Sequence, residues 1–392
     1  MMKILLIVFN WVGKGTYWRA LKFAEHLCRR GREVTLLATS QHNRIGIEER
    51  IINQVRLVET PDLFTGSLRS GWDMWNVCNR IAWLRNHDFD IVHVFEARPV
   101  ALFPALYMQR IKHISLVMDW ADWFGKGGSV EERPNPIIRN ILRPVETFFE
   151  EHFRTWADGT TVICTTLQQK ATELGVPPNT IVMLPNGCDT ERFEVIPHQI
   201  ARRRLHFPHD MLIIGYMGSI FQHDAELMAC AFDIICQQIA DVRLLVIGYC
   251  PIDIRQLVKK PQYVIQTGFI EDEYLNNHLA SCDVCWLPFK NTNANKGRWP
   301  LKLNDYMAVG RPTIATAVGD VVSLFETEPI GLLAEDNPMS FAEKSMQLLH
   351  DSTLRLEMGT HARHVAETRF SWADLTRRLE DLYQYILKTG TK

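Results

Sequence analysis

Residues 297–312, which read GRWPLKLNDYMAVGRP, place two cations at the expected start of a helix. A helix N-terminus gathers unpaired backbone N–H groups and partial positive charge, so it favours phosphate. Pro300 is tolerated in a first turn, and we expect the helix to begin near Leu301. Arg298 and Lys302 add mobile positive charge. The segment predicts a diphosphate site, although an ordinary amphipathic helix with solvated cations has the same pattern.

Asp305 lies one turn further along the same expected helix. A carboxylate there can accept hydrogen bonds from the hydroxyl groups of a ribose. Cations for a diphosphate and an acid for a ribose together outline a site for a nucleotide sugar. We therefore assign Arg298, Pro300, Leu301, Lys302 and Asp305 to donor binding.

Two glycine turns that follow apolar runs are further candidates for phosphate contact. Gly13 and Gly15 come after the run at residues 3–9, and Gly218 and Ser219 come after the run at residues 212–217. Glycine lets backbone N–H groups approach an anion closely. The first turn lacks the third glycine of a dinucleotide fingerprint, so a plain tight turn explains it equally well.

Composition indicates an ordinary globular protein. The chain has 392 residues, 46% hydrophobic and 22% charged, with a formal net charge of −2. This length predicts two or three domains, and this charge argues against a nucleic-acid partner. The apolar run near the N-terminus is too short for a signal peptide or a membrane span. Nine cysteines, an odd number, suggest reduced thiols. We expect a cytoplasmic protein, with attachment to the inner face of a membrane left open.

Strand and helix patterns alternate along the whole chain, which predicts parallel sheets with right-handed crossovers. A polar, irregular stretch after Asn186 separates two such series. The fold class is therefore α/β, with two doubly wound domains and a cleft between them in which ligands bind beyond the carboxyl ends of the strands. Expected strands lie at residues 3–9, 33–38, 91–95, 114–118, 160–164, 212–217, 243–247, 264–267, 284–287 and 313–316.

Six phrases, in order, resemble the retaining glycosyltransferases of family 4, also called group 1. They are MKILLIVFN with GREVTLLA, LPNGCDTERF, IGYMGS, LLVIG with CDVCWLPF, NDYMAVGRPTIAT and FSWADLTRRLEDLY. The resemblance implies the GT-B architecture of two Rossmann-like domains. It implies an acceptor domain at residues 1–188, a donor domain at 189–370, and a helix at 371–392 that crosses back to the first domain.

The same resemblance assigns roles where residues match. The family carries two glutamates eight positions apart; Asp305 takes the second position and Gly297 the first, so recognition of the sugar must differ here. Ser219 and about His223 stand where the family has a diphosphate-binding Arg and Lys. From the need for charge we infer that Arg298 and Lys302 replace them.

The resemblance also implies positions for the nucleobase and for the acceptor. In this fold the nucleobase lies near the turn that holds Gly268, Phe269 and Ile270, although a core position explains the phenylalanine equally well. On the acceptor side Asp122 is the main candidate to contact the acceptor and take a catalytic part beside Arg298 and Lys302. Asp119 and Glu96 are further candidates, and helix capping explains the two aspartates as an alternative.

The reaction that follows is transfer of a glycosyl group from a nucleoside diphosphate sugar to a hydroxyl of a sugar, lipid-linked or small-molecule acceptor. The resemblance implies retention of configuration, and no acidic pair suggests a metal, so we expect neither metal nor cofactor. Two alternatives stay open: a non-catalytic nucleotide-sugar binder and a sugar epimerase of the same fold. Residues 74–84 form either a surface helix suited to a membrane or, by the same apolar stripe, a helix packed on the sheet.

Overall fold

The computed structural model describes residues 1–63 and 71–389. They divide into two compact units: Met1–Pro185 joined by the segment from Trp372, and Asn186–Ser371. Each unit holds one sheet with helices between successive strands. The predicted α/β class with two parallel-dominated sheets is therefore confirmed.

The sheet of the N-terminal unit has the order β3-β4-β2-β1-β5-β6-β7-β8. All neighbouring strands run parallel except the β3–β4 pair. The bounds are β1 (Lys3–Trp11), β2 (Glu33–Thr39), β3 (Glu48–Ile52), β4 (Val55–Thr60), β5 (Ile91–Phe95), β6 (Ser115–Trp120), β7 (Gly159–Val162) and β8 (Ile181–Met183).

Helices cover both faces of this sheet. They are α1 (Tyr17–Arg29), α2 (Met74–Leu84), α3 (Pro99–Arg110), α4 (Pro136–Glu151), α5 (Thr165–Glu173) and α14 (Trp372–Thr389). Alternate residues of β1 enter different layers, as the period of two in a strand requires. Ile4, Leu6 and Val8 pack with α1 and α14, whereas Leu5, Ile7 and Phe9 pack with α2 and α3.

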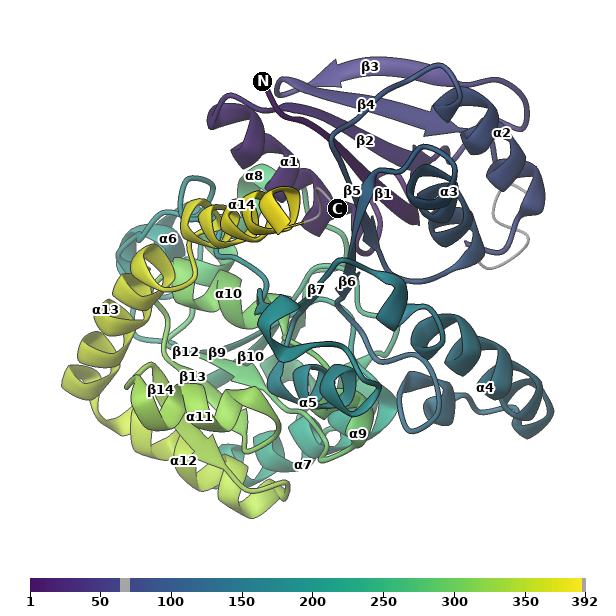
Figure 1. Cartoon of the computed structure of the whole chain (residues 1–392). Coiled ribbons are helices and arrows are strands. Elements are labelled where there is room, and N and C mark those ends of the chain that lie inside the picture. The colour runs from purple at the N-terminus through teal and green to yellow at the C-terminus, as the bar shows by residue number, and fades with distance from the viewer. Residues whose placement is uncertain (64–70, 390–392) are drawn as a thin grey trace. The chain divides into compact units, whose positions relative to one another are not determined.

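Helix α14 belongs to the N-terminal unit although it ends the chain. It packs beside α1 (Figure 1). The Tyr383 hydroxyl lies 2.7 Å from Nδ1 of His93, a buried side chain on β5 whose pKa burial lowers to about 3. Glu380 pairs with Arg30 and Arg32, which follow α1. Apolar packing, one buried hydrogen bond and two ion pairs thus fix the helix on this unit.

The C-terminal unit contains a six-stranded sheet of order β11-β10-β9-β12-β13-β14, with every neighbouring pair parallel. Its strands are β9 (Leu212–Met217), β10 (Val242–Ile247), β11 (Val264–Gln266), β12 (Val284–Leu287), β13 (Thr313–Thr316) and β14 (Gly331–Ala334). Its helices are α6 (His198–Arg204), α7 (Gln222–Gln238), α8 (Asp272–Ala280), α9 (Asn293–Lys296), α10 (Leu301–Ala308), α11 (Asp320–Thr327), α12 (Pro338–His350) and α13 (Ser352–Thr368).

The expected strands are present, and four more were not predicted: β3, β4, β8 and β14. β3 is an exposed, charged edge strand, so it lacks the apolar signal of a buried one. β8 and β14 contain only three and four residues. The ambiguous segment at residues 74–84 is α2, and its Val77 and Leu84 pack against the sheet. The packed-helix alternative is therefore the one that the structure shows.

A buried ion pair joins α1 to β6 and offers a test of the N-terminal core. Arg19 donates to both carboxylate oxygens of Asp119 at 3.0 Å, and both side chains are buried. Asp119→Ala would strand the arginine charge, so we expect a loss of about 3–5 kcal/mol in the free energy of unfolding. Urea denaturation measures it. Asp374→Ala, which breaks surface ion pairs with Arg377 and Arg378, should cost at most about 1 kcal/mol for each; equal losses would contradict the assignment.

Candidate functional site

Three glycines form an open row at the carboxyl edge of the C-terminal sheet. Gly218, Gly248 and Gly268 follow the adjacent strands β9, β10 and β11, with φ of 79°, 83° and 68°. The Gly218 N–H donates to Ile247 at 2.8 Å, and Gly248 pairs with Gly268. A Cβ at any of the three would meet no atom within 4 Å. The row therefore leaves backbone accessible to a ligand.

Lys302, in the first turn of α10, lies against the loop after β9. Its Nζ donates to the Tyr216 hydroxyl at 2.5 Å and to the Ser219 carbonyl at 3.2 Å. Burial lowers the pKa of Lys302 to about 8, and the nearby Asp224 carboxylate partly opposes that shift. The ammonium group is thus desolvated without an ion-pair partner of its own among the described residues. An anion arriving here would gain a strong electrostatic contact.

Arg298 reaches the same loop from the segment before α10. Its Nη1 donates to Asn295 at 3.0 Å, and its guanidinium lies 5.4 Å from the ring centroid of the half-exposed Phe221. Pro300 occupies the N-cap of α10, where no side chain caps the helix, and Leu301 is 54% exposed. The structure therefore brings the two predicted cations together beside an open helix N-terminus.

A network of amides holds the start of α10 in place. Asn304 donates to the carbonyls of Asn186 and Gly187 at 2.6 and 3.0 Å. Its Oδ1 accepts a hydrogen bond of 2.9 Å from the Trp299 indole, which stacks on Phe370 at 5.0 Å. These groups are buried, so their hydrogen bonds are expensive to break. The position of the helix N-terminus is consequently rigid.

Asp305 is half-buried on α10, and burial raises its pKa to about 7 although Arg192 acts in the opposite direction. Within residues 1–63 and 71–389, no group donates a hydrogen bond to its carboxylate. Such an unsatisfied acceptor is suited to hydroxyl donors. The next residue, Tyr306, accepts a hydrogen bond of 3.0 Å from the Met217 N–H at the end of β9, which joins α10 to the glycine row.

Exposed aromatic rings follow two of the three glycines. Phe269 is 83% exposed and Tyr249 is 66% exposed, and Ile270 beside them is half-buried. The alternative that Phe269 belongs to the core is therefore wrong: its backbone follows a left-handed glycine at the sheet edge, which turns the ring outward. Flat faces at such an edge can cover an aromatic ligand.

The glycine turn of the N-terminal unit has a fixed shape. Gly13 and Gly15 have φ of 78° and 58°, and a Cβ on Gly15 would come within 2.4 Å of the Asn10 amide. The Trp18 indole donates to the Gly13 carbonyl at 2.9 Å, and Gln41 donates to the Val12 carbonyl. Only glycine fits at residue 15, and the loop is held by its carbonyls.

The acids of the N-terminal unit differ in accessibility. Asp119 has no exposed surface. Burial alone would raise its pKa, but the charge and hydrogen bonds of Arg19, together with His93 and Thr161, outweigh burial and lower it. This placement leaves Asp119 no surface to offer an acceptor. Glu96 is 2% exposed and has a left-handed φ of 69° at the end of β5, a costly conformation for this residue type. Burial, and after it the charge of Asp122, raises the pKa of Glu96 well above normal. Asp122 is half-buried beside it.

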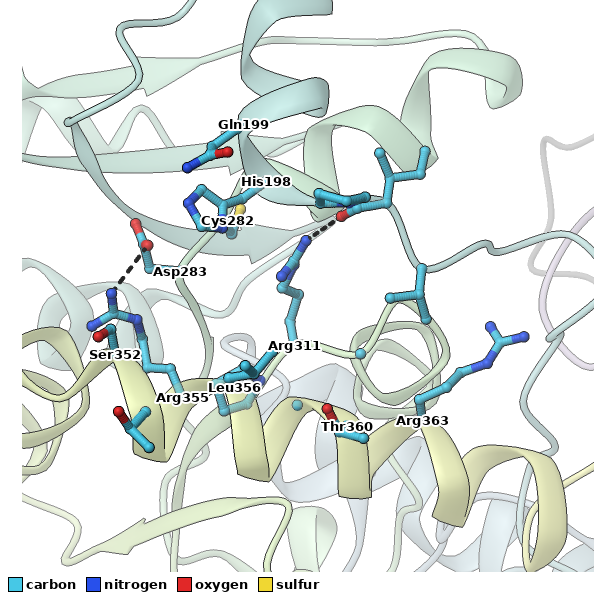
Figure 2. A pocket seen from close by; sticks show the side chains of 17 residues that line it. His198, Gln199, Cys282, Asp283, Arg311, Ser352, Arg355, Leu356, Thr360 and Arg363 are labelled. Atoms are coloured by element: carbon cyan, nitrogen blue, oxygen red, sulfur yellow. Dashed lines mark hydrogen bonds and ion pairs between the residues drawn. The ribbon is translucent and has the colours of Figure 1, made fainter.

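A cavity of about 740 Å³ lies elsewhere in the C-terminal unit. Its lining includes Asp283 and Pro312, which directly precede β12 and β13, so it opens at the amino edge of the sheet. Figure 2 shows Arg311, Arg355 and Arg363 around it. Each donates to backbone carbonyls, among them those at the ends of α8, α10 and α12. These arginines complement helix C-termini and belong to the scaffold.

Sequence reasoning did not find Tyr216, Phe221 or Tyr249. Tyr216 lies inside a buried strand, where an aromatic residue carries no sign of function. Tyr249 follows a strand-ending glycine, as Phe269 does, and that shared pattern was the available signal. Within the described ranges, no three His, Cys, Asp or Glu side chains come together as metal ligands. Nor does any described helix have the length and apolarity to cross a membrane.

Comparison with known proteins identifies two family domains. Residues 14–192 match the model described as Glycosyltransferase Family 4, and residues 211–351 match Glycosyl transferases group 1. The capsular polysaccharide biosynthesis glycosyltransferase CapM of Staphylococcus aureus is 25% identical to this chain over an alignment that covers 52% of this chain and 54% of CapM. The chain spans about half the length, or less, of the curated relatives it matches.

Solved structures share the fold. Sucrose-phosphate synthase from Thermosynechococcus elongatus gives a TM-score of 0.77 at 18% identity, covering 99% of this chain and 100% of that one. Anabaena Alr3699/HepE in complex with UDP gives 0.71 at 16% identity, covering 98% and 100%. At these low identities the likeness shows a shared fold alone.

The environment of Lys302 predicts unusual amine reactivity. With a pKa of about 8, Lys302 carries a neutral, nucleophilic amine in about half of the molecules at pH 8. For an ordinary lysine that fraction is less than about 1%. Competitive acetylation across pH, read by mass spectrometry, should rank Lys302 well above the surface residue Lys344 at pH 8. A Lys302 profile that matches that of Lys344 would contradict this environment.

Proposed function

Because the chain belongs to the glycosyltransferases of family 4 and group 1, we propose that it transfers a sugar from a nucleoside diphosphate sugar to a hydroxyl acceptor. The observation that carries the proposal is the pairing of Lys302 and Arg298 with the uncapped start of α10, next to the glycine row. Structural neighbours are described in complex with UDP and UDP-glucose, which supports a donor of this class.

The proposed donor lies along the carboxyl edge of the C-terminal sheet. Phe269 and Tyr249 offer flat faces to the base, and Asp305 accepts hydrogen bonds from the ribose. The diphosphate takes the N–H groups at the start of α10 together with Lys302 and Arg298. Each part of the donor thus meets a group of matching chemistry, in the order base, ribose and phosphate.

Cleavage of the bond between the anomeric carbon and the diphosphate oxygen leaves negative charge on the diphosphate. The ammonium of Lys302, the guanidinium of Arg298 and the α10 dipole stabilise that charge more in the transition state than in the ground state. The acceptor oxygen bonds to the anomeric carbon, and its proton passes to the departing diphosphate oxygen. We propose retention of configuration and no required metal, which NMR of the anomeric product and assays in EDTA would test.

On the acceptor side we propose Asp122, with the buried Glu96 beside it, as the group that contacts the incoming hydroxyl. Asp122 is the more accessible of the two. A relative is named for capsular polysaccharide biosynthesis, which supports a sugar or lipid-linked acceptor.

A pure nucleotide-sugar binder is the second candidate, favoured by Gly297, Ser219 and His223 at positions where the family carries charged side chains. An enzyme releases nucleoside diphosphate slowly from donor even without acceptor, whereas a binder releases none. Product analysis in the same reaction also detects an epimerase, which would return a changed donor.

We expect Lys302→Ala to weaken binding of nucleoside diphosphate about 10- to 100-fold, because one charge-assisted contact is lost. Lys302→Arg should keep most of the affinity. In the wild-type protein the affinity should fall as the pH rises through about 8, where the lysine loses its proton, and this fall should vanish in Lys302→Arg. Calorimetry with UDP across pH, with Lys344→Ala as control, measures it; an unchanged Kd in Lys302→Ala rejects the role.

Asp305→Ala should raise the KM for the donor severalfold. For 2′- and 3′-deoxyribose analogues of the donor, which lack the hydroxyls, the KM should differ little between the wild type and the variant. In the wild type, donor affinity should increase from pH 6 to pH 7.5, because ionisation near pH 7 creates the acceptor that the ribose hydroxyls need. Asp305→Asn removes this pH dependence and retains the shape. Steady-state kinetics with each donor decide; identical KM values for wild type and Asp305→Ala would overturn the ribose assignment.

A further inference from the structure

Helix α4 buries two of its acids and turns most of its large apolar side chains outward. Glu146 and Glu150 are the residues that it buries. All of its exposed residues are uncharged: Pro136, Ile137, Ile138, Asn140, Ile141, Pro144, Val145 and Phe148. A surface helix of a globular protein normally shows the opposite arrangement. Figure 1 shows α4 at the margin of the N-terminal unit. The five large apolar side chains of this strip are 38–69% exposed.

The buried acids fix this orientation. Glu146 accepts a hydrogen bond of 2.9 Å from Arg133. Glu150 accepts hydrogen bonds of 2.8 and 2.6 Å from the N–H groups of Phe124 and Gly125. Burial raises the pKa of Glu150 to about 7 despite those donors. Rotating α4 to hide its apolar strip would break these bonds and strand their partners, so the strip stays outside.

Aromatic rings and a cation extend the strip beyond the helix. Phe148 stacks on His152 at 4.8 Å, and His152 lies 5.8 Å from Trp156. The guanidinium of Arg110 lies 4.9 Å from the Trp156 ring. A tryptophan that is 37% exposed beside an arginine is typical of the boundary between hydrocarbon and lipid headgroups.

Further cations border the strip along α4. Arg139 and Arg143 are half-buried, with their stems beside the apolar residues. Arg143 pairs with Glu131 at 2.5 Å, and Arg139 donates to the Glu131 carbonyl at 3.4 Å. Lys126 is exposed nearby, its N–H donating to Thr147 of α4. Arg143 is ion-paired with Glu131, so the positive charge of the border comes from Arg110, Lys126 and Arg139. Glu146 and Glu150 of the helix point into the protein, and Glu151 pairs with Lys170.

We propose that this outer face of α4, defined by Ile137, Ile138, Ile141, Val145 and Phe148 with Trp156 and Arg110 at one end, docks on an anionic lipid surface. A helix of 16 residues is about 24 Å long and lies in the plane of an interface. Its apolar side enters the acyl boundary while the arginines reach phosphate headgroups. Apolar burial and charge act together, as interfacial binding requires.

The docking surface is linked to the proposed acceptor side. Glu150 and Thr147 of α4 hold the N–H groups of residues 124–126, which follow Asp122. A docked α4 therefore keeps the Asp122 loop next to the lipid surface, where a lipid-anchored acceptor would be presented. This consequence rests on the proposed function, whereas the docking itself does not.

Co-sedimentation of the full chain with vesicles tests the docking. We expect binding to mixed phosphatidylglycerol and phosphatidylcholine vesicles, and much weaker binding to pure phosphatidylcholine. Ile141→Asp should reduce the partition coefficient at least tenfold, and Leu356→Asp, at a helical residue of the other unit that is 72% exposed, should leave it unchanged. High salt should weaken wild-type binding.

Equal binding by Ile141→Asp and the wild type would overturn the proposal. A wild type that binds neither vesicle type would also overturn it. A wild type that instead forms a dimer, which Ile141→Asp dissolves, would assign the face to a second copy of the chain and reject lipid. Because Ile141 is exposed, the melting temperature should stay constant. UDP binding by Ile141→Asp should also be unchanged, so a failure of lipid docking is distinguishable from a failure of the transferase assignment.

Discussion

The parallel alignment of the strands in the C-terminal unit determines where its charges lie. Helices α7, α8, α10 and α11, each of which leads into the next strand, then start near the carboxyl edge of the sheet and end near the amino edge. Helix N-termini carry positive and C-termini negative partial charge. Arg311, Arg355 and Arg363 answer the negative ends with hydrogen bonds to terminal carbonyls. At the opposite edge the start of α10 has no side-chain cap, and the glycine row lies open. One edge is neutralised by the protein itself, and the other is left for a ligand.

Rigid placement of α10 makes that edge useful. Asn304 and Tyr306 secure the helix through hydrogen bonds with Trp299, Asn186 and Met217. Lys302 is held in the same way against Tyr216 and Ser219, and it loses part of its hydration before any ligand arrives. Since the desolvation and ordering costs are met during folding, a diphosphate bound as proposed would gain most of the electrostatic energy. The lowered pKa of Lys302 and the raised pKa of Asp305 are two signs of this preparation.

The sequence predicted the parts that depend on local pattern. Apolar runs located ten strands, and the resemblance to family 4 implied the closing helix, α14. The start of α10 followed from Pro300, and the strand-ending glycine at 218 marked an open turn. What it could not supply depends on tertiary contact. Asp119 and Asp122 are three residues apart and look equivalent, yet Arg19, a hundred residues away, buries only the first. Phe269 was ambiguous because its exposure depends on its place at the edge of the folded sheet. The outward apolar face of α4 could not be predicted because it depends on hydrogen bonds that Glu146 and Glu150 accept from residues outside the helix.

In the N-terminal unit, buried acids hold a loop in place through their hydrogen bonds. Glu96 combines a left-handed backbone with a buried carboxyl group of raised pKa that accepts a hydrogen bond from the Ala121 N–H, while Glu150 ties the loop after Asp122 to α4. Removing either acid would leave buried N–H groups without acceptors. The Asp122 loop is therefore as firmly positioned as the start of α10, but by carboxylates and not by amides. Glu150 also belongs to α4, where it and Glu146 keep the apolar residues outward. The hydrogen bonds of Glu150 thus contribute both to the placement of a polar loop and to the exposure of an apolar helix face.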